Sequence, residues 1–278
     1  MSGSGPAAAI EEGRLPGRIW FYSTYACNLA CTYCLTESAP GVPRRALDGA
    51  TIVELTQQAA ALGFTDVGIT GGEPFLSPDL PAVLTQVASM LPTVVLSNGT
   101  LFNDRRLAAL KPLARFPLRI QVSLDADQPD VNDAARGPEN FAKVVDAIPR
   151  LLDVGVGVRV ATTLNGTPDP EAMARLCELH RSLGVADEDH VVRPIVRRGR
   201  AQVRGEGVDV TPADLPAELT ITADGAFWSP FGPTVAAGVL DTDLLITRTT
   251  NPLRIPAEAL LRLVEGRPPG EDARTGIR

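Results

Sequence analysis

Short β-rich runs alternate with helix-compatible stretches over the first two thirds of this chain, and this pattern restricts the fold most. The runs that predict strands are residues 18–23, 65–70, 93–97, 118–124, 156–163 and 190–196. The stretches between them that predict helices are residues 47–62, 79–91, 103–113, 139–154 and 170–183. A parallel sheet is indicated, because parallel neighbours need a crossover connection. Since six units are too few for the usual eight-stranded closed barrel, we expect an open, partial α/β barrel.

The pattern divides the chain into five segments. Residues 1–17 begin with small and polar side chains and predict a flexible N-terminus, and residues 18–196 form the barrel. Residues 197–218 are rich in charge, Gly and Pro and predict a linker. Residues 219–266 predict a C-terminal cap, with a hairpin turning at Ala223-Asp224-Gly225, a further strand at 243–248 and a helix at 256–265. Residues 267–278 predict a disordered tail.

Composition excludes several classes of function. The net charge is −7 and only 5% of residues are aromatic, which argues against a nucleic-acid-binding protein. No apolar run approaches the ~18 residues of a membrane span, and no secretory signal begins the chain. The four cysteines are too unevenly spaced for a disulfide framework. We therefore expect a cytoplasmic protein with no membrane or nucleic-acid partner.

Three of the four cysteines form a compact motif directly after the first predicted strand. Cys27, Cys31 and Cys34 have the spacing C-x3-C-x2-C, and Cys177 lies far away. Three thiolates within eight residues can hold one metal centre, and an iron–sulfur cluster normally takes four. A cluster held by this motif would leave one iron open to another ligand.

Polar, glycine-containing loops follow the next three predicted strands. They are Gly71-Gly72-Glu73-Pro74, Ser97-Asn98-Gly99-Thr100 and Ser123-Leu124-Asp125. Because the carboxyl ends of parallel strands form the active face of such folds, these loops and the cysteine loop should surround one site.

Taken together, these motifs resemble the radical S-adenosylmethionine (radical SAM) superfamily over residues 18–196. The cysteine motif has Tyr33 at the family's aromatic position, and Gly71 to Pro74 match its GGEP motif. The Asn-Gly and Ser-Leu-Asp segments also match, and Arg136 follows with Phe141 behind it. The resemblance implies a partial (βα)6 TIM-like barrel with a small C-terminal hairpin and helix extension.

The resemblance also implies two cofactors. Cys27, Cys31 and Cys34 would hold one 4Fe–4S cluster, and SAM would bind the open iron and be cleaved reductively to a 5′-deoxyadenosyl radical. The residues expected to bind SAM are Tyr33, Gly71, Gly72, Glu73, Pro74, Asn98, Ser123, Asp125 and Arg136. Glu73 would meet the methionine ammonium, and Arg136 or Ser123 the carboxylate. The alternatives are a turn-forming role for Asn98, a surface position for Arg136 and a packing role for Tyr33.

Residues after the barrel resemble the start of a SPASM or twitch extension. Such extensions hold auxiliary clusters, yet no cysteine follows Cys177. We therefore expect a degenerate extension, a single cluster, and Trp228 and Phe231 as lid or core residues. Cys177, His180 and His190 are expected to be structural. The basic residues of 193–204, namely Arg193, Arg197, Arg198, Arg200 and Arg204, form either a solvated loop or a contact for an anionic substrate group or a peptide carboxylate.

The resulting hypothesis is a radical SAM enzyme of biosynthesis that abstracts hydrogen from a ribosomal peptide or a small molecule. A flavodoxin- or ferredoxin-type protein would supply the electron. A molybdenum-cofactor cyclase would need a second cysteine triad, which the sequence lacks. The alternative from another class is a non-catalytic zinc or iron–sulfur module.

Overall fold

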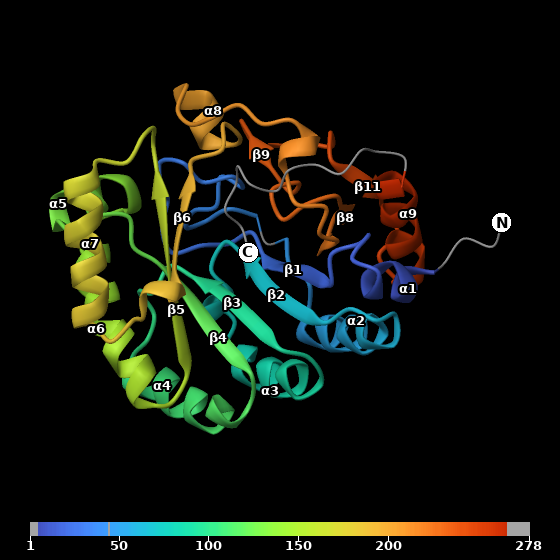
Figure 1. Cartoon of the computed structure of the whole chain (residues 1–278), viewed down its shortest axis with the longest axis horizontal. Helices are drawn as coiled ribbons and strands as arrows, with labels where there is room; N and C mark the ends of the chain where they lie inside the picture. Colours follow the sequence, from blue (N-terminus) through green and yellow to red (C-terminus); the bar gives the residue numbers. More distant parts are fainter. Residues whose placement is uncertain (1–4, 44, 266–278) are drawn as a thin grey trace.

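Six parallel strands form a curved sheet whose outer face is covered by helices (Figure 1). The computed structural model describes residues 5–43 and 45–265. The parallel strands are β1 (Arg18–Thr24), β2 (Asp66–Gly71), β3 (Thr93–Ser97), β4 (Leu118–Ser123), β5 (Gly157–Leu164) and β6 (His190–Pro194). The helices between them are α2 (Gly49–Ala61), α3 (Leu80–Met90), α4 (Asp104–Leu110), α5 (Pro129–Arg136), α6 (Asn140–Asp153) and α7 (Pro170–Ser182). The predicted partial barrel is confirmed.

The strand sequences fit a sheet that is covered on both faces. The five central residues of β1 are all buried, as expected for a parallel strand with helices outside and a filled interior. Gly68 of β2 pairs with Trp20 of β1, and a Cβ at Gly68 would lie 2.2 Å from the indole ring. The glycine therefore leaves room for Trp20 inside the barrel.

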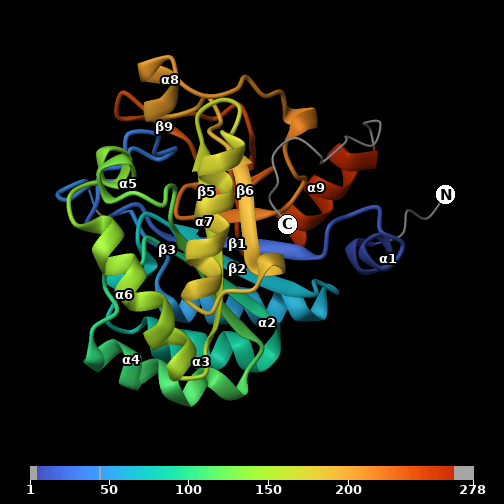
Figure 2. The same cartoon turned by 60° about the vertical axis from the view of Figure 1, so that its left-hand side comes forward.

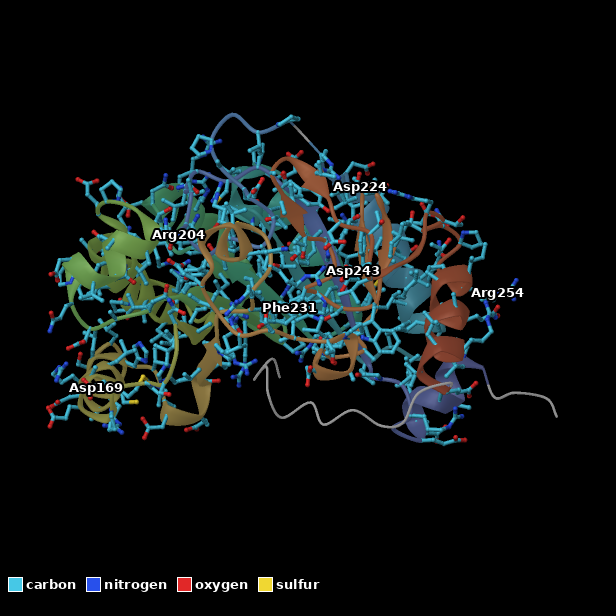
Figure 3. The ribbon with its side chains drawn as sticks, turned by 90° about the horizontal axis from the view of Figure 1, so that it is seen from above. Asp169, Arg204, Asp224, Phe231, Asp243 and Arg254 are labelled. Carbon is cyan, nitrogen blue, oxygen red and sulfur yellow. The ribbon has the colours of Figure 1, made fainter. Side chains whose placement is uncertain are left out.

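Local signals fix the helix ends. Asp48 accepts a hydrogen bond from the backbone N–H of Thr51 at 2.8 Å and caps α2. Asp169 caps α7 in the same way (Figure 3). In Figure 2, α7 lies in front of β5 and β6 and covers their outer side.

The prediction of a flexible N-terminus is wrong for residues 5–17. Helix α1 (Pro6–Glu11) is followed by Leu15, which is 1% exposed. Arg14 pairs with Glu265 of α9 (Arg254–Glu265) at 2.7 Å, and the two helices lie side by side (Figure 1). Ordering this segment is favourable because its apolar side chains join the core. Residues 1–4 lie outside the described residues.

The predicted linker, residues 197–218, is also folded against its surroundings. It contains α8 (Arg200–Arg204) and a 3₁₀ turn at Pro212–Asp214. Arg198 is 9% exposed and binds Asp243 at 2.7 Å. Several arginines of this segment, among them Arg197, Arg198 and Arg204, form ion pairs with nearby carboxylates.

The C-terminal extension joins the barrel sheet. Strand β7 (Thr220–Thr222) pairs in parallel with β1, β8 (Gly225–Phe227) forms the expected hairpin with β7, and β11 (Leu245–Thr247) pairs with β8. The sheet thus has nine strands, and β9 (Val235–Ala236) and β10 (Val239–Leu240) form a separate ribbon. The predicted tail, residues 267–278, lies outside the described residues.

Helices in residues 5–43 and 45–265 are all too short or too polar to cross a bilayer.

Candidate functional site

A cavity of about 190 Å³ lies where the cysteine loop meets the carboxyl ends of the barrel strands. All three cysteines of the motif line it. Of the nine residues expected to bind SAM, six also line it, namely Tyr33, Gly71, Gly72, Asn98, Ser123 and Arg136. The structure thus gathers segments more than 100 residues apart around one space. Their contacts with SAM stay predictions.

The three thiols differ in their surroundings. Cys27 is 7% exposed, and Cys31 and Cys34 are half-buried. Burial raises the pKa of Cys27 to about 11, although its sulfur accepts a hydrogen bond from the backbone N–H of Leu29 at 3.3 Å. Burial also raises the pKa of Cys31, against the opposing effect of Arg136. Each thiol must lose its proton to bind a metal, so metal binding would release protons here.

The donor set fits a cluster better than a single ion. Among the residues that the structure describes, no three Cys, His, Asp or Glu side chains converge on a point that would hold one metal ion. A zinc ion needs such convergence, with sulfur ligands about 2.3 Å away. In a 4Fe–4S cluster each thiolate binds a different iron, so three thiols that line one cavity are compatible with a cluster.

The two glycines of the GGEP motif allow the cysteine loop to lie directly against the β2 loop. A Cβ at Gly72 would lie 2.1 Å from the carbonyl oxygen of Ala26, and one at Gly71 would lie 2.2 Å from that of Thr24. The backbone N–H of Gly72 also donates to Thr24 at 2.7 Å. Both glycines therefore position the cysteine loop as well as lining the cavity.

Glu73 lies apart from the cavity wall. Its carboxylate is fully buried and accepts hydrogen bonds from Ser97 Oγ and from the backbone N–H groups of Phe75 and Asn98. Burial raises the pKa of Glu73 to about 7 despite these donors. Glu73 thus joins the GGEP loop to the end of β3. Pro74 is buried and begins the following 3₁₀ turn. The predicted SAM contacts of both residues stay predictions.

Asn98 connects the β3 loop to the cysteine loop. Its Nδ2 atom donates to Asn28 Oδ1 at 2.9 Å and lies 3.6 Å from Cys27 Sγ. Its Oδ1 atom accepts from the backbone N–H of Thr100 at 3.0 Å. The turn-forming role and a position on the cavity wall are therefore both present.

A buried group of three side chains joins the cysteine loop, the end of β4 and the end of α5. Asp125 pairs with Arg136 Nη1 at 3.0 Å, and Tyr33 donates its hydroxyl to the same carboxylate. Arg136 is 6% exposed, so a surface position for it is wrong. Burial opposes its charge, but Tyr33 and Asp125 more than offset this and raise the pKa of Arg136. Asp125 itself stands behind the cavity wall.

Thr163 and Arg193 are among the cavity-lining residues that fall outside the sequence predictions for the SAM site. Thr163 of β5 and Arg193 of β6 are register partners on adjacent strands, and both line the cavity. The signal that could have found them is the period-2 pattern of β6, which places Val191 and Arg193 on one face of the strand.

The C-terminal extension contributes to the cavity. Pro230 and Phe231 line it, and the carbonyl oxygen of Pro230 accepts from Tyr22 Oη at 2.8 Å. Figure 3, seen from above, places Phe231 near the centre of this side of the molecule. Trp228 and Phe231 both belong to the main hydrophobic core, and of the two Phe231 alone lines the cavity. Phe231 is thus the lid candidate, and Trp228 has the packing role.

Cys177 and the two histidines lie together outside this cavity. Cys177 is half-buried, and its sulfur lies 3.6 Å from His190 Nδ1. His190 Nε2 lies 2.8 Å from Thr162 Oγ1, and His180 packs edge-on against the His190 ring. Burial, then the nearby His190, lowers the pKa of His180 to about 4. Their placement favours the expected structural roles.

Comparison with known proteins identifies a family. The sequence model described as Radical SAM superfamily matches residues 21–181. A GTP 3′,8-cyclase of Chlorobaculum tepidum is 33% identical over 50% of this chain and 42% of its own length. The mycofactocin maturase MftC of Mycobacterium ulcerans is 27% identical over 81% of this chain and 53% of its own length. The chain thus spans about half the length of these curated relatives.

Solved structures agree on the fold. Native anSMEcpe with bound AdoMet has a TM-score of 0.64 at 11% identity, covering 89% of this chain and 82% of that one. Streptococcus suis SuiB bound to precursor peptide SuiA has a TM-score of 0.59 at 18% identity, covering 75% of this chain and 46% of that one. At these identities the likeness concerns the fold alone.

Proposed function

Because this chain belongs to the radical SAM superfamily, whose enzymes use a 4Fe–4S cluster and SAM, we propose that Cys27, Cys31 and Cys34 hold a single cluster in the cavity described above. When bound, the cluster and SAM supply a 5′-deoxyadenosyl radical by one-electron cleavage of a carbon–sulfur bond, and this radical abstracts hydrogen from substrate. A flavodoxin- or ferredoxin-type protein would provide the electron. The protein's own contribution is binding, orientation and exclusion of water.

One observation carries this proposal: three thiols from one loop line the same cavity as Asn98, Ser123 and Arg136, which lie at the ends of β3, β4 and α5. Arg136 carries a guanidinium that is held in place by Asp125 and Tyr33, and its buried Nε atom has no hydrogen-bond partner within residues 5–43 and 45–265. A fixed guanidinium beside the thiols suits the carboxylate of SAM's methionine part. Gly71 and Gly72 would bring backbone close to the ammonium.

The substrate we propose is a ribosomal peptide. Support comes from the maturase MftC, which aligns with 81% of this chain, and from SuiB, whose solved structure contains a precursor peptide. The cavity wall fits an organic substrate, because Leu29, Leu35 and Phe231 add apolar surface to it. A cytoplasmic location would keep the cluster reduced.

Anaerobic reconstitution with iron and sulfide tests the proposal. We expect about four irons per chain, because three thiolates and SAM complete one cluster. With dithionite and SAM, we expect methionine and 5′-deoxyadenosine, measured by liquid chromatography and mass spectrometry. Replacing Cys27, Cys31 and Cys34 together by Ala should abolish both the iron and the cleavage, whereas Cys177→Ala should leave both unchanged.

The same experiment separates the alternative of a non-catalytic metal module. A colourless protein that binds one zinc ion and leaves SAM intact under reductant would reject the enzymatic proposal. About eight irons per chain would reject the single-cluster prediction, which rests on the lack of any cysteine after Cys177.

A further inference from the structure

Arg193 presents a guanidinium to the cavity without an anionic partner. It is half-buried on β6 and lines the cavity. Among the described residues, its side chain makes one hydrogen bond, from Nε to Thr163 Oγ1 at 3.4 Å. No ion pair joins it to a carboxylate in that part of the chain, although neighbouring Arg197 and Arg198 both have such pairs. A guanidinium in an apolar wall is costly unless an anion approaches it.

The charges around the cavity leave a place for an anion. Among the described residues that line it, the charged side chains are Arg136 and Arg193, and none is a carboxylate. Arg136 is already paired with Asp125 behind the wall. The pKa of Arg193 is lowered, and burial is the main cause. The nearby Arg136 lowers it further, whereas Tyr33 and Asp125 partly offset the decrease. The unmatched positive charge is therefore that of Arg193.

Arg193 and Arg136 hold different positions around the cavity, although Thr163, the hydrogen-bond partner of Arg193, donates its backbone N–H to Asp125 Oδ1 at 2.9 Å. Arg136 lies beside the thiols, because its carbonyl oxygen is 3.8 Å from Cys31 Sγ and its guanidinium contacts Tyr33 of the cysteine loop. Arg193 instead also lines a second, smaller cavity inside the barrel, together with Arg159 and Gln121. Arg193 thus lines both cavities, whereas Arg136 lines only the larger one.

From this geometry, and resting on the function proposed above, we infer that Arg193 and Thr163 form a subsite for a carboxylate group of the substrate. The two Nη groups of Arg193 form a fork that matches two carboxylate oxygens. The Thr163 hydroxyl accepts from Arg193 Nε and keeps its own hydrogen for a ligand oxygen. The carboxylate belongs either to the C-terminus of a peptide or to an Asp or Glu side chain. The enzyme thereby selects acidic substrates.

Affinity selection with synthetic peptides tests the subsite. The probes are pools of N-acetylated random hexapeptides in four matched versions, with a free or amidated C-terminus and with or without Asp and Glu. They are incubated anaerobically with the reconstituted enzyme and SAM, and retained peptides are counted by ultrafiltration and mass spectrometry. We expect carboxylate-bearing peptides to be enriched about 10-fold over matched neutral ones, since charge-assisted hydrogen bonds have this strength. Which version is enriched identifies the source of the carboxylate.

The variants are Arg193→Gln, Arg193→Lys and the control Arg197→Gln, which changes an exposed arginine of the same segment. Arg193→Gln should abolish the enrichment, Arg193→Lys should retain part of it, and Arg197→Gln should match the wild type. All should keep the wild-type iron content and SAM affinity. The inference is overturned if the wild type shows no carboxylate enrichment, if Arg193→Gln retains it, or if Arg193→Gln weakens SAM binding instead. SAM cleavage by the wild type is measured in a separate assay, and its failure would reject the proposed function rather than the carboxylate subsite alone.

Discussion

Arg200 of α8 donates a hydrogen bond from Nη1 to the backbone carbonyl oxygen of Cys31 at 2.9 Å. Its Nη2 atom donates to the carbonyl oxygens of Glu37 and Ser38. The backbone N–H of Arg200 donates to the carbonyl oxygen of Cys34 at 3.0 Å. One residue of the predicted linker thus contacts the second half of the loop that carries the thiols, from Cys31 to Ser38. A segment far away in the sequence therefore helps to fix the positions of Cys31 and Cys34.

Replacing Arg200 by Met should loosen the cysteine loop. The change removes three charge-assisted hydrogen bonds to carbonyl oxygens, and we expect a loss of about 2 kcal/mol in the free energy of unfolding. Reconstituted iron per chain should also fall, because three separated thiols bind a cluster less well. Urea denaturation and iron analysis measure the two effects. The exposed Arg204 of the same helix gives the control Arg204→Met, and equal losses in both variants would contradict the prediction.

Replacing Gly72 by Ala should disrupt the contact between the GGEP loop and the cysteine loop. The new Cβ would lie 2.1 Å from the carbonyl oxygen of Ala26, so one of the two loops must move. We expect a loss of SAM cleavage larger than the loss of stability, measured by product formation and thermal unfolding. Gly5→Ala adds the same methyl group where nothing lies within 4 Å and should retain wild-type activity. Full activity of Gly72→Ala would rule out this role for the glycine.

Replacing Asp125 by Asn should leave the buried Arg136 without its counter-charge. Both side chains are less than 10% exposed, and breaking a buried pair from one side typically costs about 3–5 kcal/mol. We expect urea denaturation to show a loss of this size, with weaker SAM binding because Arg136 is no longer oriented. Asp127→Asn breaks the more exposed pair with Arg175 and should cost at most about 1 kcal/mol. A similar cost for both variants would contradict the assignment.

The raised pKa of Glu73 predicts a dependence of stability on pH. Since burial raises the pKa from 4.5 to about 7, the folded protein retains a proton that the unfolded chain loses. The stabilisation that comes from the protonated Glu73 is therefore fully present below pH 4.5. As the pH rises from 4.5 to 7, the free energy of unfolding falls by about 3 kcal/mol. His180 contributes with the opposite sign, because its pKa is lowered from 6.5 to about 4. Because His180 is present in the wild type and in every variant compared, its contribution to the pH dependence of stability cancels in the difference between them.

The measurement is urea denaturation of the metal-free protein under reductant, from pH 4.5 to 8. Glu73→Gln should be less stable at low pH and should lack the Glu73 part of the slope. Glu178→Gln, at an exposed helix position, should have the wild-type slope. A slope that is unchanged in Glu73→Gln would show that the carboxyl does not titrate in this range.

Much of the fold could be predicted because its signals are local. The alternation of strands and helices and the turn at Ala223-Asp224-Gly225 depend on residues close together in the sequence, and both are confirmed. The N-terminal helix α1 was missed because its stability comes from contact with α9, some 240 residues away. The linker was missed for the same reason, since the partners of Arg198 are Asp241 and Asp243.

For the site, the sequence by itself determined the chemical groups: three thiols at a fixed spacing, a glycine pair and polar loops at strand ends. Only the tertiary structure decided their neighbours. It placed Glu73 apart from the cavity wall, buried Arg136 against Asp125, and placed Arg193 beside Thr163 with no carboxylate paired to it among the described residues. The reason is physical: spacing along the chain fixes which atoms a loop can offer. Which of them meet a ligand depends on packing between segments as far apart as Cys31 and Arg200.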